Sequence, residues 1–141
     1  MKNNFILTLK EQLSNRKEIV IIPHKNPDGD ALGSCLGLKH FFDLMGHSCS
    51  VISPNEYPEF LEWIPGQEQI IKYNKSEEES EKLLLEADLI FTLDFNSLSR
   101  IKPMDEVIDN CRAIKVMIDH HEQPDDYADL MYSDPSLGST C

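Results

Sequence analysis

The sequence lacks the features that mark membrane, secreted and disulfide-rich proteins. It contains no run of about 18 apolar residues, which argues against a transmembrane helix. Its start, Met1–Phe5, has neither the apolar core nor the cleavage site of a signal peptide. The cysteines are scattered without a CxxC pair, which favours reduced thiols in a cytoplasmic protein over disulfides or zinc ligands. They are Cys35, Cys49, Cys111 and Cys141.

Basic residues are also scarce, because 13 Lys and Arg stand against 25 Asp and Glu, giving a formal net charge of −12. This balance argues against a long nucleic acid or a membrane surface as partner. It does not exclude a small phosphorylated ligand, because bound divalent cations reverse the charge locally. At 141 residues and 40% hydrophobic composition, the chain has the length of one domain and enough apolar residues for a core. We find no internal repeat, linker or low-complexity segment.

Three short apolar runs each lead into acidic residues or histidines. The run 18–23 opens into His24–Asp30, the run 89–93 ends at Asp94, and the run 114–118 ends at Asp119. Short apolar runs that alternate with helical segments predict an α/β domain with a parallel sheet. Around these runs we expect helices at 2–15, 31–45, 76–86 and 104–111. We also expect a strand at 49–53 and an edge strand at Ile70–Ile71.

Four further expectations concern packing. The apolar face of the 31–45 helix is wide enough for the helix to be mostly buried. In the loop 54–66, Tyr57, Phe60 and Trp63 are expected to anchor the chain by local core packing rather than to stack bases. The segment Leu137–Cys141 is typical of a helix start, with Ser139 or Thr140 as the N-cap. The run near Met117 is expected to be the last strand, with an unpaired edge.

The acidic residues should converge, because ligands of parallel sheets bind at the carboxyl edge of the strands. Several carboxylates brought together repel one another unless a cation lies among them. Oxygen ligands together with imidazole favour a divalent metal such as manganese. In such a two-metal site Asp94 would bridge the ions, while Asp28 and Asp30 could face different ions. Taken alone, Asp30 is more typical of a helix N-cap, and His24 is more typical of a hydrogen-bonded loop histidine than of a ligand. The metal site is predicted from the whole set of residues.

Asp119, His120 and His121 are consecutive, and adjacent side chains on a strand point to opposite faces. One histidine can therefore bind metal while the other meets substrate, and Asp119 is placed to orient a histidine. Asn26 and Arg100 are candidate substrate contacts. For Arg100 two interpretations stay open: it contacts a substrate phosphate, or it is an ordinary surface arginine.

Taken together, these residues resemble a known family. The segment His24–Ser34 resembles the first motif of the DHH phosphoesterases, Asp94 in the segment Thr92–Asp94 resembles the second, and Asp119–His121 is similar to the signature that names the family. The order Asn-Pro-Asp-Gly-Asp and the interval to Asp94 resemble the nanoRNase branch, which hydrolyses short oligoribonucleotides and 3′-phosphoadenosine 5′-phosphate (pAp). The resemblance implies a three-layer α/β domain and a metal-dependent phosphoesterase.

The resemblance also implies roles for individual residues. His24, Asp28 and Asp94 would hold one Mn²⁺ ion, and Asp30, Asp94 and His120 the second; Mg²⁺ or Co²⁺ could replace manganese. His121 would contact the scissile phosphate or the leaving group, and Asp119 would support the site. The family's fourth motif and its DHHA1 substrate-binding domain have no counterpart up to Cys141. We therefore expect residues 1–141 to form the N-terminal part of a DHH domain. On its own, this chain should bind manganese weakly and hydrolyse dinucleotides or pAp very poorly.

Other functions stay open. Related enzymes include cyclic-dinucleotide phosphodiesterases and manganese inorganic pyrophosphatases, and a non-catalytic nucleotide-binding or metal-binding module belongs to another class. A phosphoacceptor receiver domain fits less well, because of the adjacent His120 and His121. The sequence does not settle the oligomeric state, and a homodimer is possible.

Overall fold

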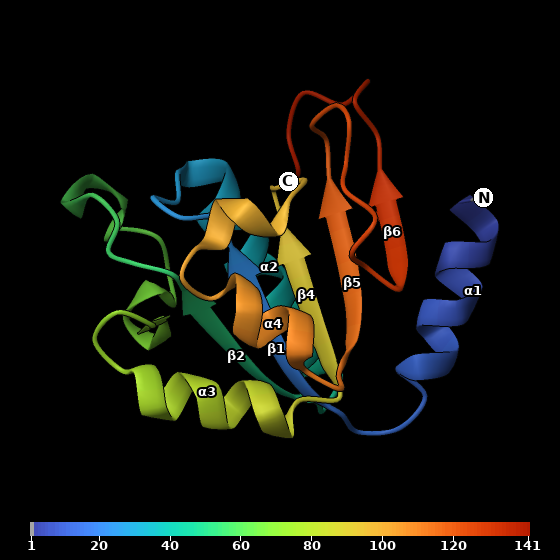
Figure 1. Ribbon diagram of the computed structural model, residues 1–141, viewed down its shortest axis with the longest axis horizontal. Helices are drawn as coiled ribbons and strands as arrows, with labels where there is room; N and C mark the ends of the chain where they lie inside the picture. The colour runs from blue at the N-terminus through green and yellow to red at the C-terminus, as the bar shows by residue number, and fades with distance from the viewer. Residues whose placement is uncertain (1) are drawn as a thin grey trace.

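A six-stranded sheet forms the centre of the computed structural model, which describes residues 2–141 (Figure 1). Its order is β3-β2-β1-β4-β5-β6, and every neighbouring pair is parallel. The strands are β1 (Glu18–Pro23), β2 (Ser48–Ser53), β3 (Ile71–Lys72), β4 (Leu89–Leu93), β5 (Ile114–Asp119) and β6 (Leu130–Ser133). The predicted α/β class with a parallel sheet is confirmed.

Helices cover both faces of the sheet, so the chain forms three layers. They are α1 (Lys2–Gln12), α2 (Gly29–Leu44), α3 (Glu77–Glu86) and α4 (Asp105–Asn110), with 3₁₀ turns at Glu59–Leu61, Gln67–Gln69 and Leu98–Ile101. Figure 1 shows α2 behind the sheet and α3 and α4 in front of it. Side chains along β1 alternate between the layers: Ile19 and Ile21 join the core under α1 and α2, whereas Val20 and Ile22 join the core under α3 and α4. Because both faces are covered, the central strands are apolar throughout rather than alternating.

The sheet continues beyond β5, which corrects the expected unpaired edge near Met117. β6 pairs with β5 in parallel, with Met117 beside Met131. The carboxylate of Asp129, just before β6, accepts a hydrogen bond from the backbone N–H of Lys115 in β5 at 2.8 Å. The helix α1 covers β6, and the ring of Phe5 lies 5.7 Å from that of Tyr132.

Two packing expectations are also wrong. The helix α2 is only half buried, because Phe41, Leu44 and Met45 lie on its exposed side. Tyr57 packs against the core as expected, whereas Phe60 and Trp63 are 72% and 76% exposed, and Leu61 fills the core in their place. The Ser139 hydroxyl accepts a hydrogen bond from the N–H of Cys141, as an N-cap does, and a helix that starts here stays a prediction.

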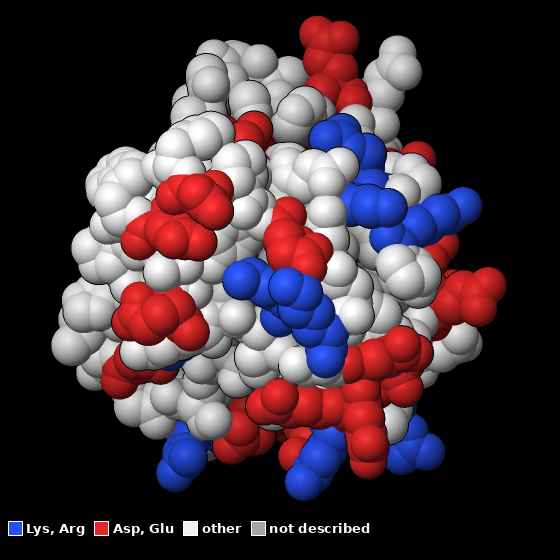
Figure 2. Space-filling view, turned by 90° about the vertical axis from the view of Figure 1, so that its left-hand side faces the viewer, with Lys and Arg blue, Asp and Glu red and all other residues white. Residues whose placement is uncertain are grey.

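The four cysteines are free thiols, as expected. No helix within residues 2–141 has both the length and the apolar character needed to cross a bilayer. Figure 2 shows a face whose lower edge is dense in acidic side chains, at the level of α3. The first turn of that helix carries Glu77, Glu78 and Glu79, all exposed as the acidic composition of 76–86 predicts.

Candidate metal centre

The candidate site lies where the strand order of the sheet reverses. From β1 the chain proceeds to β2 on one side, and the later strands β4 and β5 are added on the other. At such a reversal the connections leave in opposite directions and open a crevice at the carboxyl ends of the strands. Pro23 and Leu93 are paired in register, so His24 and Asp94 are the first residues past the sheet on either side of this crevice.

The loop after β1 is fixed in shape before α2 begins. Asn26 has a positive φ of 53°, and its backbone N–H donates to the side-chain oxygen of Asn55 at 2.8 Å. In return, the amide of Asn55 donates to the side-chain oxygen of Asn26 at 2.7 Å. The N-cap of α2 is Asp28, whose Oδ1 accepts a hydrogen bond from the N–H of Ala31 at 2.9 Å. The capping role considered for Asp30 therefore belongs to Asp28.

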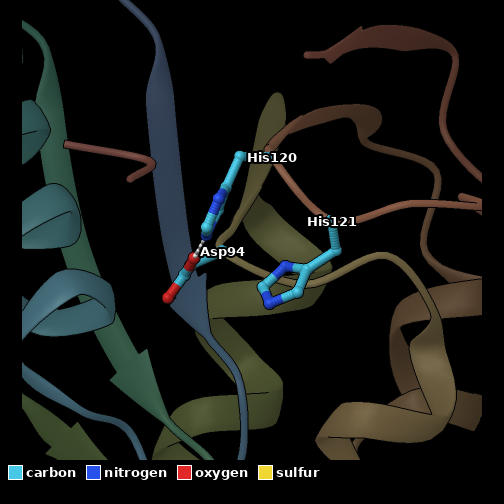
Figure 3. A group of neighbouring side chains, drawn as sticks. All are labelled: Asp94, His120 and His121. Atoms are coloured by element: carbon cyan, nitrogen blue, oxygen red, sulfur yellow. Dashed lines mark ion pairs between the residues drawn. The ribbon is translucent and has the colours of Figure 1, made fainter. Parts of the chain in front are cut away.

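Asp94 stands at the centre of the site, between two imidazole rings. Its Oδ2 lies 3.6 Å from Nε2 of His24, and its Oδ1 lies 3.2 Å from Nε2 of His120. Figure 3 shows the ring of His120 aimed at this carboxylate. The backbone of Asp94 has a φ of 66°, in the left-handed region that aspartate tolerates better than most residues, and its side chain is only 3% exposed. A buried carboxylate in this conformation is typical of a functional site.

Four of the five side chains predicted to bind metal fall into two groups of neighbouring side chains, and His121, predicted to contact the substrate, lies with them. Ligand atoms of His24, Asp28 and Asp94 lie within 4.8 Å of one another, and so do those of Asp94, His120 and His121. Asp94 belongs to both groups, with one oxygen toward each side. The donor set of carboxylate oxygens and imidazole nitrogens suits hard or borderline divalent cations. The residues present therefore fit a pair of divalent ions, and their individual roles as ligands stay predictions.

Asp30 lies at the edge of this cluster, with Oδ2 3.6 Å from Nε2 of His120. Both of its oxygens also accept hydrogen bonds from the end of the chain. The N–H groups of Thr140 and Cys141 donate to Oδ2 and Oδ1, both at 3.0 Å, and the Ser139 hydroxyl donates to Oδ1 at 2.8 Å. Oδ2, the oxygen nearer His120, accepts only one of these three hydrogen bonds and therefore has a lone pair left for a cation. The role of Asp30 as a ligand of a second ion stays a prediction.

Asp119 contacts the second of these groups through His121, to which it is hydrogen-bonded. The side chain of Asp119 is fully buried, and its Oδ1 lies 2.7 Å from Nδ1 of His121. A buried carboxylate is an acceptor, so Nδ1 carries the proton and Nε2 of His121 is left for another partner. The ring of His121 lies beside that of His120, with the ring centroids 4.5 Å apart and the planes tilted by 48° (Figure 3).

Two groups in the site have shifted pKa values. The hydrogen bond to Asp94 raises the pKa of His24 above its ordinary value, against an opposing effect of burial. For Asp30, burial raises the pKa, but the hydrogen bonds from the N–H groups of Thr140 and Cys141 and from Ser139 outweigh it, so the net pKa is strongly lowered. In the metal-free protein these contacts therefore stabilise the protonated form of His24 and the charged form of Asp30.

The two candidate substrate contacts are placed differently. The side-chain oxygen of Asn26 is already used by Asn55. Arg100 is exposed, and its carbonyl accepts a hydrogen bond from the N–H of Lys25 at 2.8 Å, which places it beside the loop after β1.

Besides the hydrogen bonds from 139–141 to Asp30, two further contacts in the site involve residues that were not among the candidates. Thr140 Oγ1 donates to Oδ1 of Asp94 at 2.9 Å, and Asn55 fixes Asn26. The available signal for Asn55 was its position just past β2, at the same edge of the sheet.

The chain is similar to known proteins in sequence and in overall fold. The model of the DHH family, N-terminal domain, matches residues 18–141. The solved structure of an exopolyphosphatase-related protein from Bacteroides fragilis is 41% identical, with a TM-score of 0.96 over 98% of this chain and 41% of that chain.

Two more distant structures show the fold alone. Exonuclease RecJ bound to manganese is 19% identical, with a TM-score of 0.51. The match covers 96% of this chain and 31% of the RecJ chain. An alpha-glucosyltransferase in complex with UDP and DNA is 13% identical, with a TM-score of 0.60 over 84% of this chain and 38% of its own. The chain thus spans about two fifths or less of the length of these solved structures.

Proposed function

This chain belongs to the DHH family, and from that premise we propose that it carries the metal site of a phosphoesterase acting on short oligoribonucleotides or pAp. The observation that carries the proposal is the position of Asp94, whose two carboxylate oxygens face the imidazoles of His24 and His120. A carboxylate placed in this way can hold two cations a few ångströms apart. Bound divalent cations, with manganese as the expected ion, would polarise the phosphoryl oxygens of the substrate.

The remaining groups act on the substrate and on the protons. His121 Nε2 faces away from Asp119 and is available to the leaving group or to a phosphoryl oxygen. Asp119 holds the proton on Nδ1 and stabilises the positive charge if Nε2 also becomes protonated. Asp94 and His24 are buried, which limits the access of bulk water to these two side chains.

A second candidate substrate is inorganic polyphosphate. The observation that favours it is the 41% identity to a protein described as exopolyphosphatase-related. Both candidates use the same metal chemistry, and they differ in whether the substrate contains a nucleoside.

The proposal is tested on the purified chain by titration with Mn²⁺ and by phosphate release from a diribonucleotide, pAp and polyphosphate. Asp94→Asn retains a side chain that tolerates a positive φ but removes the charge. We expect it to weaken manganese binding and to abolish the metal-dependent rate. Asp109→Asn, an exposed residue of α4, is the matched control and should behave like the unmodified chain. If Asp94→Asn binds Mn²⁺ and hydrolyses these substrates as the control does, the proposed metal site is wrong.

A further inference from the structure

A cavity of about 400 Å³ lies directly beside the candidate metal centre. It separates the loop after β1 from the segment that follows β2. Its lining residues are Asn26, Pro27, Asp28, Glu56, Tyr57, Pro58, Phe60 and Leu61. Asp28 belongs both to this lining and to one of the two candidate ligand groups, so the cavity adjoins the metal centre.

Two walls of the cavity are held rigidly. The Tyr57 hydroxyl donates to the carbonyl oxygen of Gln67 at 3.0 Å and to its side-chain oxygen at 2.7 Å. Nζ of Lys72 lies 5.0 Å from the centre of the Tyr57 ring. On the opposite wall, the paired hydrogen bonds with Asn55 fix Asn26. Because these walls are already ordered, little binding energy is lost in ordering them when a ligand binds.

The chemistry of the lining selects a flat and largely apolar ligand. Most of its surface comes from proline, leucine and aromatic side chains, and Phe60 stands 72% exposed at its margin. Its charged members are the carboxylates of Asp28 and Glu56, and among the described residues that line it there is no lysine, arginine or histidine.

Glu56 is held in its charged form. Hydrogen bonds from Lys75 and Asn74 lower its pKa to about 2. Its charge is paired with Nζ of Lys75, 2.8 Å from Oε1. The described lining residues offer a polyanion no cation of their own, whereas an uncharged ring with N–H donors can stack on an aromatic side chain and donate to a carboxylate.

We propose that this cavity binds the nucleobase of a nucleotide whose phosphate lies at the metal centre, with the base stacked on Phe60. The inference rests on the proposed function and narrows it, because a base subsite favours nucleotides over inorganic polyphosphate as substrates. Stacking tolerates any base, so the subsite selects for a base without strongly selecting which one.

The test measures binding of 5′-AMP and of inorganic phosphate to the chain in the presence of Mn²⁺, by calorimetry. We expect 5′-AMP to bind more tightly than phosphate. Phe60→Leu keeps an apolar side chain but removes the ring, so it should weaken 5′-AMP binding by roughly 5- to 100-fold and leave phosphate binding unchanged. Phe60→Trp should restore 5′-AMP binding.

Trp63→Leu is the matched control, because Trp63 is equally exposed, lies three residues away and does not line the cavity. It should change neither affinity. Phosphate binding that depends on Mn²⁺, with 5′-AMP affinity unaltered in Phe60→Leu, would overturn the base subsite and leave the proposed function standing. Absence of metal-dependent binding for both probes would overturn both. Because Phe60 is exposed, the variants should fold, and circular dichroism verifies this.

Discussion

Asp119 holds His121 with two hydrogen bonds, one from the backbone N–H to Oδ2 at 3.1 Å and one between Nδ1 and Oδ1 at 2.7 Å. The pair fixes both the orientation of the imidazole and the nitrogen that carries its proton. Since Asp119 lies in register with Ser133 of β6, this orientation is set by the sheet itself.

The first prediction concerns this pair. Asp119→Asn retains the shape of the side chain but can present an amide N–H to Nδ1, which would move the proton of His121 to Nε2. We expect kcat to fall roughly 10- to 100-fold while KM changes little. The ¹⁵N chemical shifts of His121 report the tautomer, and an unchanged tautomer with unchanged kcat would show that Asp119 is only structural.

The second prediction concerns the shared carboxylate. Asp94→Asn should lower the stoichiometry of bound Mn²⁺ and reduce the rate more than Asp28→Asn does, because Asp94 faces both candidate groups. Electron paramagnetic resonance of Mn²⁺ counts the ions, and matched rate assays compare the two variants. A larger loss for Asp28→Asn than for Asp94→Asn would contradict the bridging role.

The third prediction is a pH dependence of the metal-free chain. Asp94 raises the pKa of His24 above the unfolded value of 6.5, so the stabilising contribution of His24 is complete below pH 6.5. It is lost as the pH rises through the raised pKa. The free energy of unfolding, measured with urea and a chelator, should therefore decrease as the pH rises from 6.5 through the raised pKa of His24. The decrease should be smaller in His24→Gln but unchanged in His40→Gln, which alters an exposed residue of α2. Protons compete with metal at His24, so Mn²⁺ affinity should increase over the same interval.

The fourth prediction concerns the loop after β1. Asn55→Ala removes both hydrogen bonds to Asn26, each of which contributes about 1 kcal/mol. We expect a loss of about 1–2 kcal/mol in unfolding free energy and weaker Mn²⁺ binding, because the loop carries Asp28. Asn74→Ala, which removes a hydrogen bond at an exposed residue, is the comparison. Equal stability and Mn²⁺ affinity in the two variants would argue against this role of Asn55.

The fifth prediction concerns the contact between α1 and β6. Phe5→Ala should destabilise the chain by about 3 kcal/mol, since Phe5 is buried and packs against Tyr132. Ile6→Ala, at a neighbouring position that is 45% exposed, should change stability by less than about 1 kcal/mol. Urea denaturation of both variants gives the comparison, and similar values would mean that α1 contributes little to stability.

The parts of the fold that the sequence predicted well are those whose composition determines their environment. β1, β4 and β5 are apolar because helices cover both faces of the sheet, and their boundaries were predicted closely. β6 was missed because its residues, Leu130–Ser133, are only half buried and follow an acidic stretch. Its strand conformation depends on pairing with β5, which a local pattern does not contain.

The same distinction holds for the site. The convergence of His24, Asp94 and His120 followed from their positions after strands. The hydrogen bonds from the segment 139–141 to Asp30 join residues more than 100 positions apart, and no local rule predicts them. Likewise, the exposure of Trp63 depends on the direction of a short 3₁₀ turn, which hydrophobicity alone does not give.

The strand order has a consequence for how the chain folds. β1 and β4 form the middle of the sheet, yet the N–H of Glu18 and the carboxylate of Asp88, which are hydrogen-bonded beside this pair, lie 70 residues apart. Parallel neighbouring strands cannot be joined by a tight hairpin. The long segment between β1 and β4 must therefore form a closed loop before the contacts between these two strands can form. Such a high contact order slows folding. We expect the rate-limiting step to be this closure, which brings His24 and Asp94 to the same edge, so that the site is assembled late and as a unit.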